Sequence, residues 1–389
     1  MYILLQGHNY RYEISEFLKL FSSEFSFIEC SEDFGVNREG ELLVNKLELD
    51  RASDRVRILT KSQVYKEGQL IYERELSQDI DLEDYEKKFA KINKKIDNDI
   101  KTISKRLIQR SMFDYLSDKY DANVPWGILT GIRPVKLIHS LMDQAKTDQE
   151  ISDFMKKEYL ISQEKLNLIM DIAKRERPFI YPTSENKISL YLSIPFCPTR
   201  CLYCSFPSHS LDRYGQHRGS YVDTLLKEAR GIKSIIEDFG KTIESLYIGG
   251  GTPTSLEAKD MDYLITSLFE ILDLSEIKEF TVEAGRPDTI TREKLEVLRK
   301  HNVDRISINP QTMNQVSLDR IGRSHSVEDI VESFKMARDL GFDNINMDLI
   351  LGLPGETPVM VEETMKRIID LDPESVTVPV SYTHLTLPT

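Results

Sequence analysis

Three of the four cysteines in this 389-residue chain, Cys197, Cys201 and Cys204, lie within eight positions in the segment IPFCPTRCLYCSF. Four cysteines are too few to provide a disulfide framework for a chain of this length. A cysteine-poor chain that places three thiols on one loop is therefore expected to hold a metal centre there. The fourth cysteine, Cys30, lies in the apolar context FSFIEC and is expected to be a small buried residue.

Ligand number and spacing distinguish the possible metal centres. A structural zinc site needs four ligands, so a Cys₃His site would require His209 or His217 in addition to the three cysteines. Three thiolates in C-x₃-C-x₂-C spacing can instead bind three irons of a [4Fe–4S] cluster and leave the fourth iron open to a chelating molecule. We favour the cluster, with the zinc site and a chance grouping of core cysteines as alternatives.

Composition and charge exclude several classes of protein. The net charge of −13 argues against a general binder of nucleic acid or anionic membranes. No apolar run is long enough to span a bilayer, and the N-terminus lacks the basic region of a secretory signal. We therefore expect a cytoplasmic protein.

From Lys187 onward, short runs of strand-forming residues alternate with helical patterns. This alternation indicates βαβ units and a parallel sheet. We expect an α/β fold, with a partial (β/α)₆ barrel resembling a TIM barrel over residues 187–379. The six expected strands lie at residues 188–194, 245–248, 279–283, 305–309, 344–351 and 375–378.

Two helices of this region carry boundary signals. One is expected to begin at Ser220, with Asp223 completing a capping box, and to end at Gly240. Another is expected to be capped by Ser326 with Asp329 and to end at residue 341.

Polar and glycine residues end or follow consecutive expected strands. The segment YIGGGTPTSL, residues 247–256, includes three consecutive glycines, which allow a backbone to approach a ligand closely or simply form a turn. The third strand ends in Glu283, Gln311 follows the fourth and Asp348 lies in the fifth. Because the chemistry of such barrels lies at the carboxyl ends of the strands, we expect these groups on one rim. Arg323 is expected either to neutralise a ligand carboxylate or to be a solvated surface arginine.

Five segments, in this order, support a family resemblance: YLSIPFCPTRCLYC, YIGGGTPT, VEAGRPD, RISINPQTMN and MDLILGLPGET. With them, residues 187–379 resemble the radical S-adenosylmethionine (SAM) superfamily, in its oxygen-independent coproporphyrinogen III oxidase-like branch. Within that branch the chain resembles the HemZ type, usually named coproporphyrinogen dehydrogenase, in its segment VPWGILTGIRPVK and its long N-terminal extension. The resemblance implies the partial barrel of radical SAM proteins.

The resemblance also implies roles for individual residues. It implies that Cys197, Cys201 and Cys204 bind a [4Fe–4S] cluster whose open iron holds SAM. The implied SAM contacts are Tyr191, Tyr203, Gly250, Gly251, Thr252, Glu283, Gln311, Arg323 and Asp348. Exposed glycine backbone suits the carboxylate and ammonium groups of SAM, and acidic side chains suit its ribose hydroxyls.

The activity implied by the resemblance is that of a radical SAM oxidoreductase of haem biosynthesis. In this reaction a 5′-deoxyadenosyl radical takes a hydrogen from a propionate of coproporphyrinogen III. Loss of CO₂ and an electron then leaves a vinyl group, and two such rounds give protoporphyrinogen IX without oxygen. The implied partners are a small-molecule tetrapyrrole and an electron donor such as flavodoxin or ferredoxin, whereas nucleic acid is not expected.

Two positions depart from the oxidases of this branch. Those oxidases carry a fourth cysteine where this chain has Phe206, and a histidine where it has Ser193. The haem-chaperone members of the branch share the phenylalanine. A radical SAM-fold haem chaperone without oxidase activity is therefore the alternative function.

The N-terminal half carries fewer functional signals. Residues 1–82, with one helix at 14–21, are expected to form a small α/β module, and residues 83–180 a helical region. A helix at 83–118 combines an apolar stripe with a basic face, which is expected to be solvated or to dock an acidic partner or RNA. VPWGILTGIRPVK, with Trp126 and Arg133, is expected to be an interdomain loop or to contact a carboxylate-rich substrate.

Residues 380–389, VSYTHLTLPT, break the strand–helix alternation. They are the translation of a transposon-type sequencing adapter, GTC TCT TAT ACA CAT CTG ACG CTG CCG ACG. We therefore expect a non-native, adapter-derived tail and a barrel truncated after Pro379, without its last outer helix and any C-terminal domain. His384 is accordingly not a candidate ligand.

Overall fold

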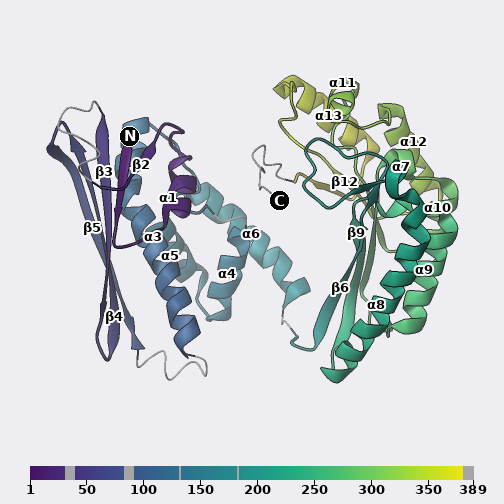
Figure 1. Cartoon of the computed structure of the whole chain (residues 1–389), viewed down its shortest axis with the longest axis horizontal. Coiled ribbons are helices and arrows are strands. Elements are labelled where there is room, and N and C mark those ends of the chain that lie inside the picture. The colour runs from purple at the N-terminus through teal and green to yellow at the C-terminus, as the bar shows by residue number, and fades with distance from the viewer. Residues whose placement is uncertain (31–39, 83–91, 131–132, 182–183, 380–389) are drawn as a thin grey trace. The chain divides into compact units, whose positions relative to one another are not determined.

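The computed structural model describes residues 1–30, 40–82, 92–130, 133–181 and 184–379, without the side chains of residues 92–95. The chain divides into two units, Met1–Pro182 and Thr183–Thr389 (Figure 1). The first unit contains both predicted N-terminal regions and the second contains the predicted barrel. The tail at 380–389 lies outside the described residues. The division of the chain into separate domains stays a prediction.

Six parallel strands form the sheet of the C-terminal unit, and neighbours in the chain are neighbours in the sheet. They correspond to the six predicted strands and confirm the α/β fold class. Among the described residues the two edge strands, β6 and β13, do not pair, so the barrel is open. The strands are β6 (Lys187–Ile194), β9 (Thr242–Gly250), β10 (Glu279–Gly285), β11 (Arg305–Ile308), β12 (Ile345–Asp348) and β13 (Ser375–Thr377).

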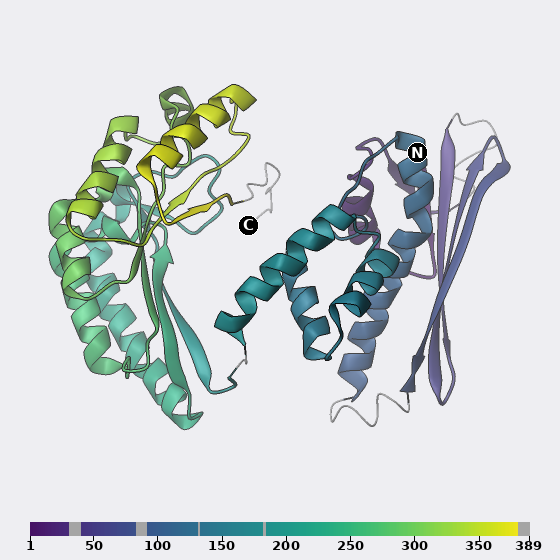
Figure 2. The ribbon, with the colours of Figure 1, turned by 180° about the vertical axis from the view of Figure 1, so that it is seen from behind.

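Helices follow the strands and cover one face of this sheet (Figure 2). Between β6 and β9, a short pair of strands, β7 (Phe196–Cys197) and β8 (His209–Ser210), encloses the cysteine loop. The helices are α7 (Leu211–Tyr214), α8 (Arg218–Asp238), α9 (Ala258–Ile271), α10 (Arg292–Lys300), α11 (Gln315–Arg320), α12 (Val327–Asp339) and α13 (Pro358–Leu371), with 3₁₀ turns η2 (Gly215–His217), η3 (Pro253–Ser255) and η4 (Pro287–Thr289).

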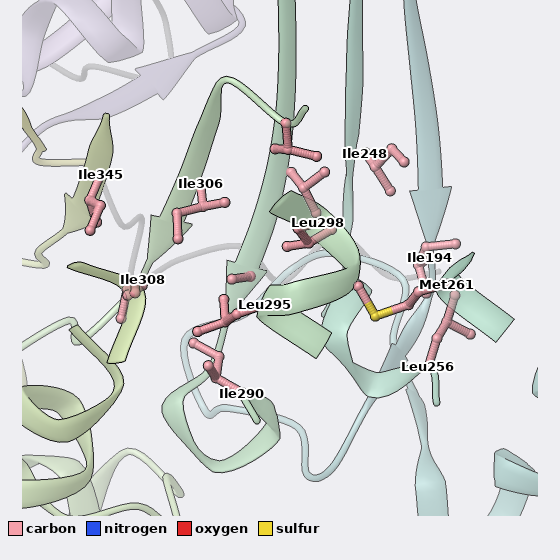
Figure 3. Close-up of a cluster of buried hydrophobic side chains, with 14 of the residues drawn as sticks. Ile194, Ile248, Leu256, Met261, Ile290, Leu295, Leu298, Ile306, Ile308 and Ile345 are labelled. Carbon is pink, nitrogen blue, oxygen red and sulfur yellow. The ribbon is translucent and has the colours of Figure 1, made fainter. Parts of the chain in front are cut away.

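Apolar and polar side chains alternate along the strands of this sheet. In β11, Ile306 and Ile308 are buried in the hydrophobic core against the helices, while Ser307 between them points to the opposite face. Figure 3 shows strand isoleucines packed with Leu295 and Leu298 of α10. This alternation leaves the face away from the helices to polar groups.

The two predicted capping boxes have different outcomes. The box at Ser326 is confirmed, because the Ser326 hydroxyl accepts a bond from the Asp329 N–H at 3.1 Å and the Asp329 carboxylate accepts one from the Ser326 N–H at 2.7 Å. The prediction of a capping box at Ser220 was wrong. Turn η2 leads directly into α8, which therefore begins at Arg218 and places Ser220 in its first turn. There the Ser220 hydroxyl donates to the His217 carbonyl at 3.0 Å.

The N-terminal unit begins with a five-stranded sheet in the order β2-β1-β3-β4-β5. Strand β1 pairs in parallel with β2 and β3, and the long β3–β4 and β4–β5 pairs are antiparallel. The strands are β1 (Tyr2–Gln6), β2 (Ser26–Ile28), β3 (Glu41–Arg51), β4 (Arg55–Lys66) and β5 (Gln69–Asp81). Helix α1 (Arg11–Leu18) begins and ends three residues earlier than predicted.

Helix α3 (Ile92–Tyr120) packs its apolar stripe on this sheet, with Leu107, Ile108 and Met112 buried. The part of this helix predicted at residues 83–91 lies outside the described residues. The basic face is partly internal to the unit: Arg106 and Arg110 both reach the carboxylate of Glu158 on helix α5 (Asp148–Tyr159), at 3.2 and 2.9 Å.

Three further helices, α4 (Pro134–Asp143), α5 (Asp148–Tyr159) and α6 (Gln163–Ile180), share a second apolar cluster in this unit. Gly127, in the segment VPWGILTGIRPVK, has φ of +58°, and a Cβ there would lie 2.2 Å from the carbonyl oxygen of Tyr159. Arg133 is exposed at the start of α4. A substrate contact by Arg133 stays a prediction, and residues 131–132 of the segment lie outside the described residues.

The prediction that Cys30 is buried was wrong: it is exposed. It lies two residues beyond the end of the short strand β2. The residues of the apolar segment FSFIEC that pack against the core of the unit are Phe25 and Phe27. None of the helices in the described ranges is long and apolar enough to cross a membrane.

Replacing Ser326 by alanine is expected to lower the free energy of unfolding by about 1 kcal/mol, because the first turn of α12 loses its cap. The matched control is Ser220→Ala, where the hydroxyl caps no helix and the expected change is within about 0.5 kcal/mol. Urea unfolding followed by far-ultraviolet circular dichroism compares the two variants. Equal effects would contradict the assignment of the cap.

Candidate functional site

A cavity of about 340 Å³ lies in the C-terminal unit at the carboxyl ends of its strands. The three clustered cysteines line it, together with eight of the nine predicted SAM contacts. Those eight are Tyr203, Gly250, Gly251, Thr252, Glu283, Gln311, Arg323 and Asp348. The expectation of one shared rim is therefore met in the geometry, although the roles of these residues stay a proposal.

The loop after β7 carries the three thiols on one wall of the cavity. Cys197 and Cys201 are buried, and Cys204 is partly buried. The Thr252 hydroxyl donates to the Cys197 sulfur at 3.4 Å, and the Cys204 N–H donates to the Cys201 carbonyl at 3.1 Å. Burial raises the pKa of the Cys197 thiol, so this thiol stays protonated until a positive centre stabilises its thiolate.

Gly250, the last residue of β9, and Gly251, which follows it, leave space for other atoms of the protein. Gly250 has φ of +113°, and a Cβ there would lie 2.6 Å from the Ser193 hydroxyl oxygen. At Gly251 a Cβ would lie 2.8 Å from the Cys197 sulfur. The glycine-rich segment is thus more than a flexible turn, because it lets strand β9 and the cysteine loop approach each other.

Glu283 lies on the polar face of the sheet beside two tyrosines. The Tyr247 hydroxyl donates to a Glu283 carboxylate oxygen at 2.6 Å. Burial is the main cause that raises the pKa of Glu283, and the nearby carboxylate of Asp348 raises it further. Tyr191 is the predicted contact that does not line the cavity: it is 58% exposed and its ring stacks on that of Tyr247.

Asp348 ends β12 on the same face. The Asn346 amide donates to its carboxylate at 2.7 Å, yet burial raises the pKa of Asp348 above its usual value. Two carboxyl groups with raised pKa values on one cavity wall indicate a site that stabilises ionised carboxylates only when a ligand supplies donors or positive charge.

Gln311 and Asn309 carry acceptors that the described protein atoms do not satisfy. The side-chain carbonyl oxygens of both residues are buried without a hydrogen-bond partner, and both residues line the cavity. Gln311 has φ of +69° and is held there by backbone bonds to Asp348 and Ile350, each 2.9 Å long. A ligand that offers hydrogen-bond donors would satisfy these oxygens.

Arg323 is buried and is not a solvated surface arginine. Its guanidinium donates to the Asn309 carbonyl at 2.5 Å and to the Tyr203 hydroxyl at 2.9 Å. Burial raises the pKa of Tyr203, so this tyrosine is a neutral partner of Arg323 beside the cysteines. Three thiols, paired carboxyl groups, unsatisfied acceptors and a buried cation fit a [4Fe–4S] cluster and a polar ligand such as SAM.

The zinc alternative lacks a fourth ligand in this arrangement. Neither His209 nor His217 is among the residues that line the cavity, and both are exposed. Within the described ranges, no group of three histidine, cysteine, aspartate or glutamate side chains could hold a single metal ion. The thiolates that bind an iron–sulfur cluster are bonded to different irons and do not need to converge on one ion.

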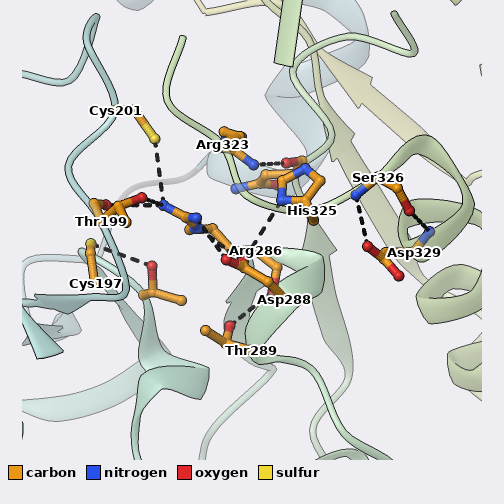
Figure 4. A network of polar contacts seen from close by, with 12 residues as sticks. Cys197, Thr199, Cys201, Arg286, Asp288, Thr289, Arg323, His325, Ser326 and Asp329 are labelled. Carbon is orange, nitrogen blue, oxygen red and sulfur yellow. Dashed lines mark hydrogen bonds and ion pairs between the residues drawn. The ribbon is translucent and has the colours of Figure 1, made fainter. Parts of the chain in front are cut away.

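Sequence reasoning missed one network of the site. Arg286 is buried and hydrogen-bonds to Asp288, which lies 3.7 Å from the buried ring of His325 (Figure 4). Arg286 also lines the cavity. The signal was present in VEAGRPD, where an arginine and an aspartate directly follow the strand that ends near Glu283.

Comparisons with known proteins agree with this geometry. Residues 191–368 match the model of the Radical SAM superfamily. The C-terminal unit is therefore a radical SAM domain. Within that superfamily it belongs to the oxygen-independent coproporphyrinogen III oxidase-like branch.

Two curated relatives and one solved structure are similar to this chain. The coproporphyrinogen-III oxidase-like protein HemZ of Bacillus subtilis is 43% identical over 257 residues, which are 65% of this chain and 51% of HemZ. The heme chaperone HemW of the same organism is 37% identical over 187 residues, 48% of each chain. The solved structure of coproporphyrinogen III oxidase (HemN) from Escherichia coli is 30% identical, with a TM-score of 0.45, over 50% of this chain and 44% of that one. The chain thus spans about half the length of the curated relatives.

Replacing Glu283 by glutamine is expected to stabilise the ligand-free protein at neutral pH. The pKa of Glu283 is higher in the folded protein than in the unfolded chain, so its contribution to stability is present at low pH and lost as pH rises through the folded pKa. Glutamine resembles the protonated acid and can still accept the bond from Tyr247. Thermal melts between about pH 4 and pH 8 should show a gain in the variant that disappears at low pH. A gain of equal size at all pH values would contradict this explanation.

Proposed function

We propose that this chain acts as a radical SAM oxidoreductase in the oxygen-independent decarboxylation of coproporphyrinogen III propionates to vinyl groups, giving protoporphyrinogen IX. The observation that supports it most is the cavity in which three thiols face Glu283, Gln311 and Asp348, in a chain that is 43% identical to HemZ. We also propose a cytoplasmic location and an electron donor such as flavodoxin or ferredoxin.

The cysteine loop would hold the cluster, and the strand ends would hold SAM. When bound, the cluster and SAM together supply the radical that abstracts a hydrogen from the substrate. Cys197, Cys201 and Cys204 would be the three protein ligands, and the first two are buried. Gly251 keeps the path to Cys197 free of a side chain.

The polar rim would orient SAM. Glu283 and Asp348 would accept from its hydroxyl or ammonium groups, and the unsatisfied oxygens of Asn309 and Gln311 would accept further bonds. Arg323 would hold Tyr203 beside the cluster through the bond of 2.9 Å between them. The carboxyl pKa values, raised without a ligand, would fall once donors reach the carboxylates.

A haem-binding chaperone is the second candidate function, and two residues favour it. Phe206, at the position of the fourth cysteine of the oxidases, is 64% exposed and lines the cavity as an apolar group. Ser193, at the position of their histidine, faces Gly250. A chaperone would keep the cluster and SAM and leave the propionates of its tetrapyrrole intact.

Replacing Gly251 by alanine is expected to lower the iron and sulfide bound per chain at least twofold, because the new Cβ would displace the Cys197 sulfur. The matched control is Gly231→Ala on α8, where a Cβ would meet no atom within 4 Å and the φ is ordinary. Iron and sulfide analysis after anaerobic reconstitution compares the two. Full cluster content in Gly251→Ala would contradict the contribution of Gly251 to the cluster site.

Replacing Cys201 by alanine is expected to abolish reductive cleavage of SAM, because one iron loses its ligand. Cys30→Ala is the matched control, since Cys30 is exposed in the other unit, and should cleave SAM at the rate of the unchanged protein. Methionine and 5′-deoxyadenosine are measured by liquid chromatography after addition of dithionite. Cleavage that persists in Cys201→Ala would overturn the cluster assignment.

Incubation of a full-length homologue with coproporphyrinogen III, SAM and a reductant separates the two candidate functions. The oxidase proposal expects the tetrapyrrole to pass from four carboxylates to two, measured by mass spectrometry. A product that keeps four carboxylates, together with stoichiometric haem binding, would support the chaperone and overturn the oxidase proposal.

A further inference from the structure

Arg286 follows strand β10 at an irregular point of the sheet. The pairing of β10 with β11 shifts register between Val282 and Gly285, and Gly285 has φ of +73°. Such a bulge bends the strand and changes the direction of the side chain that follows it. Arg286 is consequently buried, with 3% of its surface exposed, beneath the cysteine loop instead of in solvent.

The guanidinium of Arg286 joins two parts of the site. On one side it donates two bonds to the Asp288 carboxylate, of 2.9 and 2.7 Å. On the other side one nitrogen donates to the Thr199 carbonyl and hydroxyl at 3.0 and 2.9 Å, and lies 3.8 Å from the Cys201 sulfur (Figure 4). Thr199 in turn donates to the Gly322 carbonyl at 3.1 Å. Arg286 therefore supports the part of the loop that carries Cys201.

The guanidinium of Arg286 lies between Cys201 on one side and the negative charge of Asp288 on the other. The positive nitrogen faces Cys201, whereas the Asp288 carboxylate lies on the side away from that sulfur. His325 is buried beside Asp288 with neither ring nitrogen hydrogen-bonded, and burial lowers its pKa, so it adds no full charge at neutral pH. Because Arg286 and Cys201 are both buried, a charge at this distance acts more strongly on the sulfur than it would in solvent.

We propose that Arg286 is a positioning residue that raises the reduction potential of the iron–sulfur cluster through its contact with Cys201, with Asp288 as the counter-charge that limits the effect. This inference rests on the cluster of the proposed function. Reduction adds one negative charge to a cluster, and a nearby cation or a hydrogen bond to a ligand sulfur stabilises that charge. The pair therefore provides two opposing influences on the same electron transfer.

Opposite shifts in two variants test this proposal. Arg286→Gln removes the cation and is expected to make cluster reduction about tenfold less favourable, which is about 59 mV more negative for one electron. Asp288→Asn removes the counter-charge and is expected to shift the potential in the positive direction. Midpoint potentials are measured by dye-mediated redox titration with electron paramagnetic resonance, on the full chain reconstituted anaerobically without SAM or substrate.

Two further variants control for structural effects. Arg286→Lys keeps a positive charge and should have a potential closer to that of the unchanged protein than Arg286→Gln has. Arg292→Gln removes an arginine on the exposed surface of α10 and should leave the potential unchanged. If Arg286→Gln binds no cluster, the potential of Asp288→Asn decides: a positive shift supports the proposal, and an unchanged or more negative potential overturns it.

Each outcome separates this inference from the function on which it rests. Potentials that move in opposite directions in the Arg286→Gln and Asp288→Asn proteins support it. Equal potentials, shifts in the same direction, or loss of the cluster from all three variants of the pair would overturn it, because the network would then only support the loop. Absence of a cluster from the unchanged protein would overturn the proposed function itself.

Discussion

The packing of one sheet face against helices is the constraint on which the rest of the C-terminal unit depends. Isoleucine, leucine and phenylalanine side chains of β9, β10 and β11 are buried under α9, α10 and α12, and each contributes roughly 1.5–3 kcal/mol of transfer free energy. Because successive side chains in a strand alternate, the same packing directs Tyr247, Glu283 and Asn346 to the opposite face. A one-residue slip in register would exchange the two sets, so the apolar core also fixes the polar site.

Close approach between two segments then builds the cavity. Strand β9 ends in glycines that leave space for Ser193 and for the sulfur of Cys197, and this brings the cysteine loop against the strand ends. The loop is also bonded from its other side, where the Leu202 N–H donates to the Ile321 carbonyl and Arg286 donates to Thr199. The three thiols are thus positioned by contacts from three separate parts of the chain.

The site is electrostatically unfavourable without a ligand. Glu283 and Asp348 are carboxyl groups with pKa values raised by burial, and the side-chain oxygens of Asn309 and Gln311 have no hydrogen-bond partner. Burial of such groups costs free energy that the hydrophobic core must offset. A ligand that satisfies them gains binding free energy, so the features that weaken the ligand-free fold are those that favour SAM in the proposed function.

Local sequence patterns alone determined the cysteine cluster, the six strands and the polar residues that end them, because thiol spacing and hydrophobic alternation depend on neighbouring positions. They failed at Ser220, where a preceding turn moved the start of α8, and at Cys30, where apolar neighbours did not imply burial. Arg286 shows what only the tertiary structure decided. Its contacts with Thr199 and Cys201, 87 and 85 positions away, depend on a bulge and on the folded cysteine loop, and no local pattern specifies a contact over such a separation.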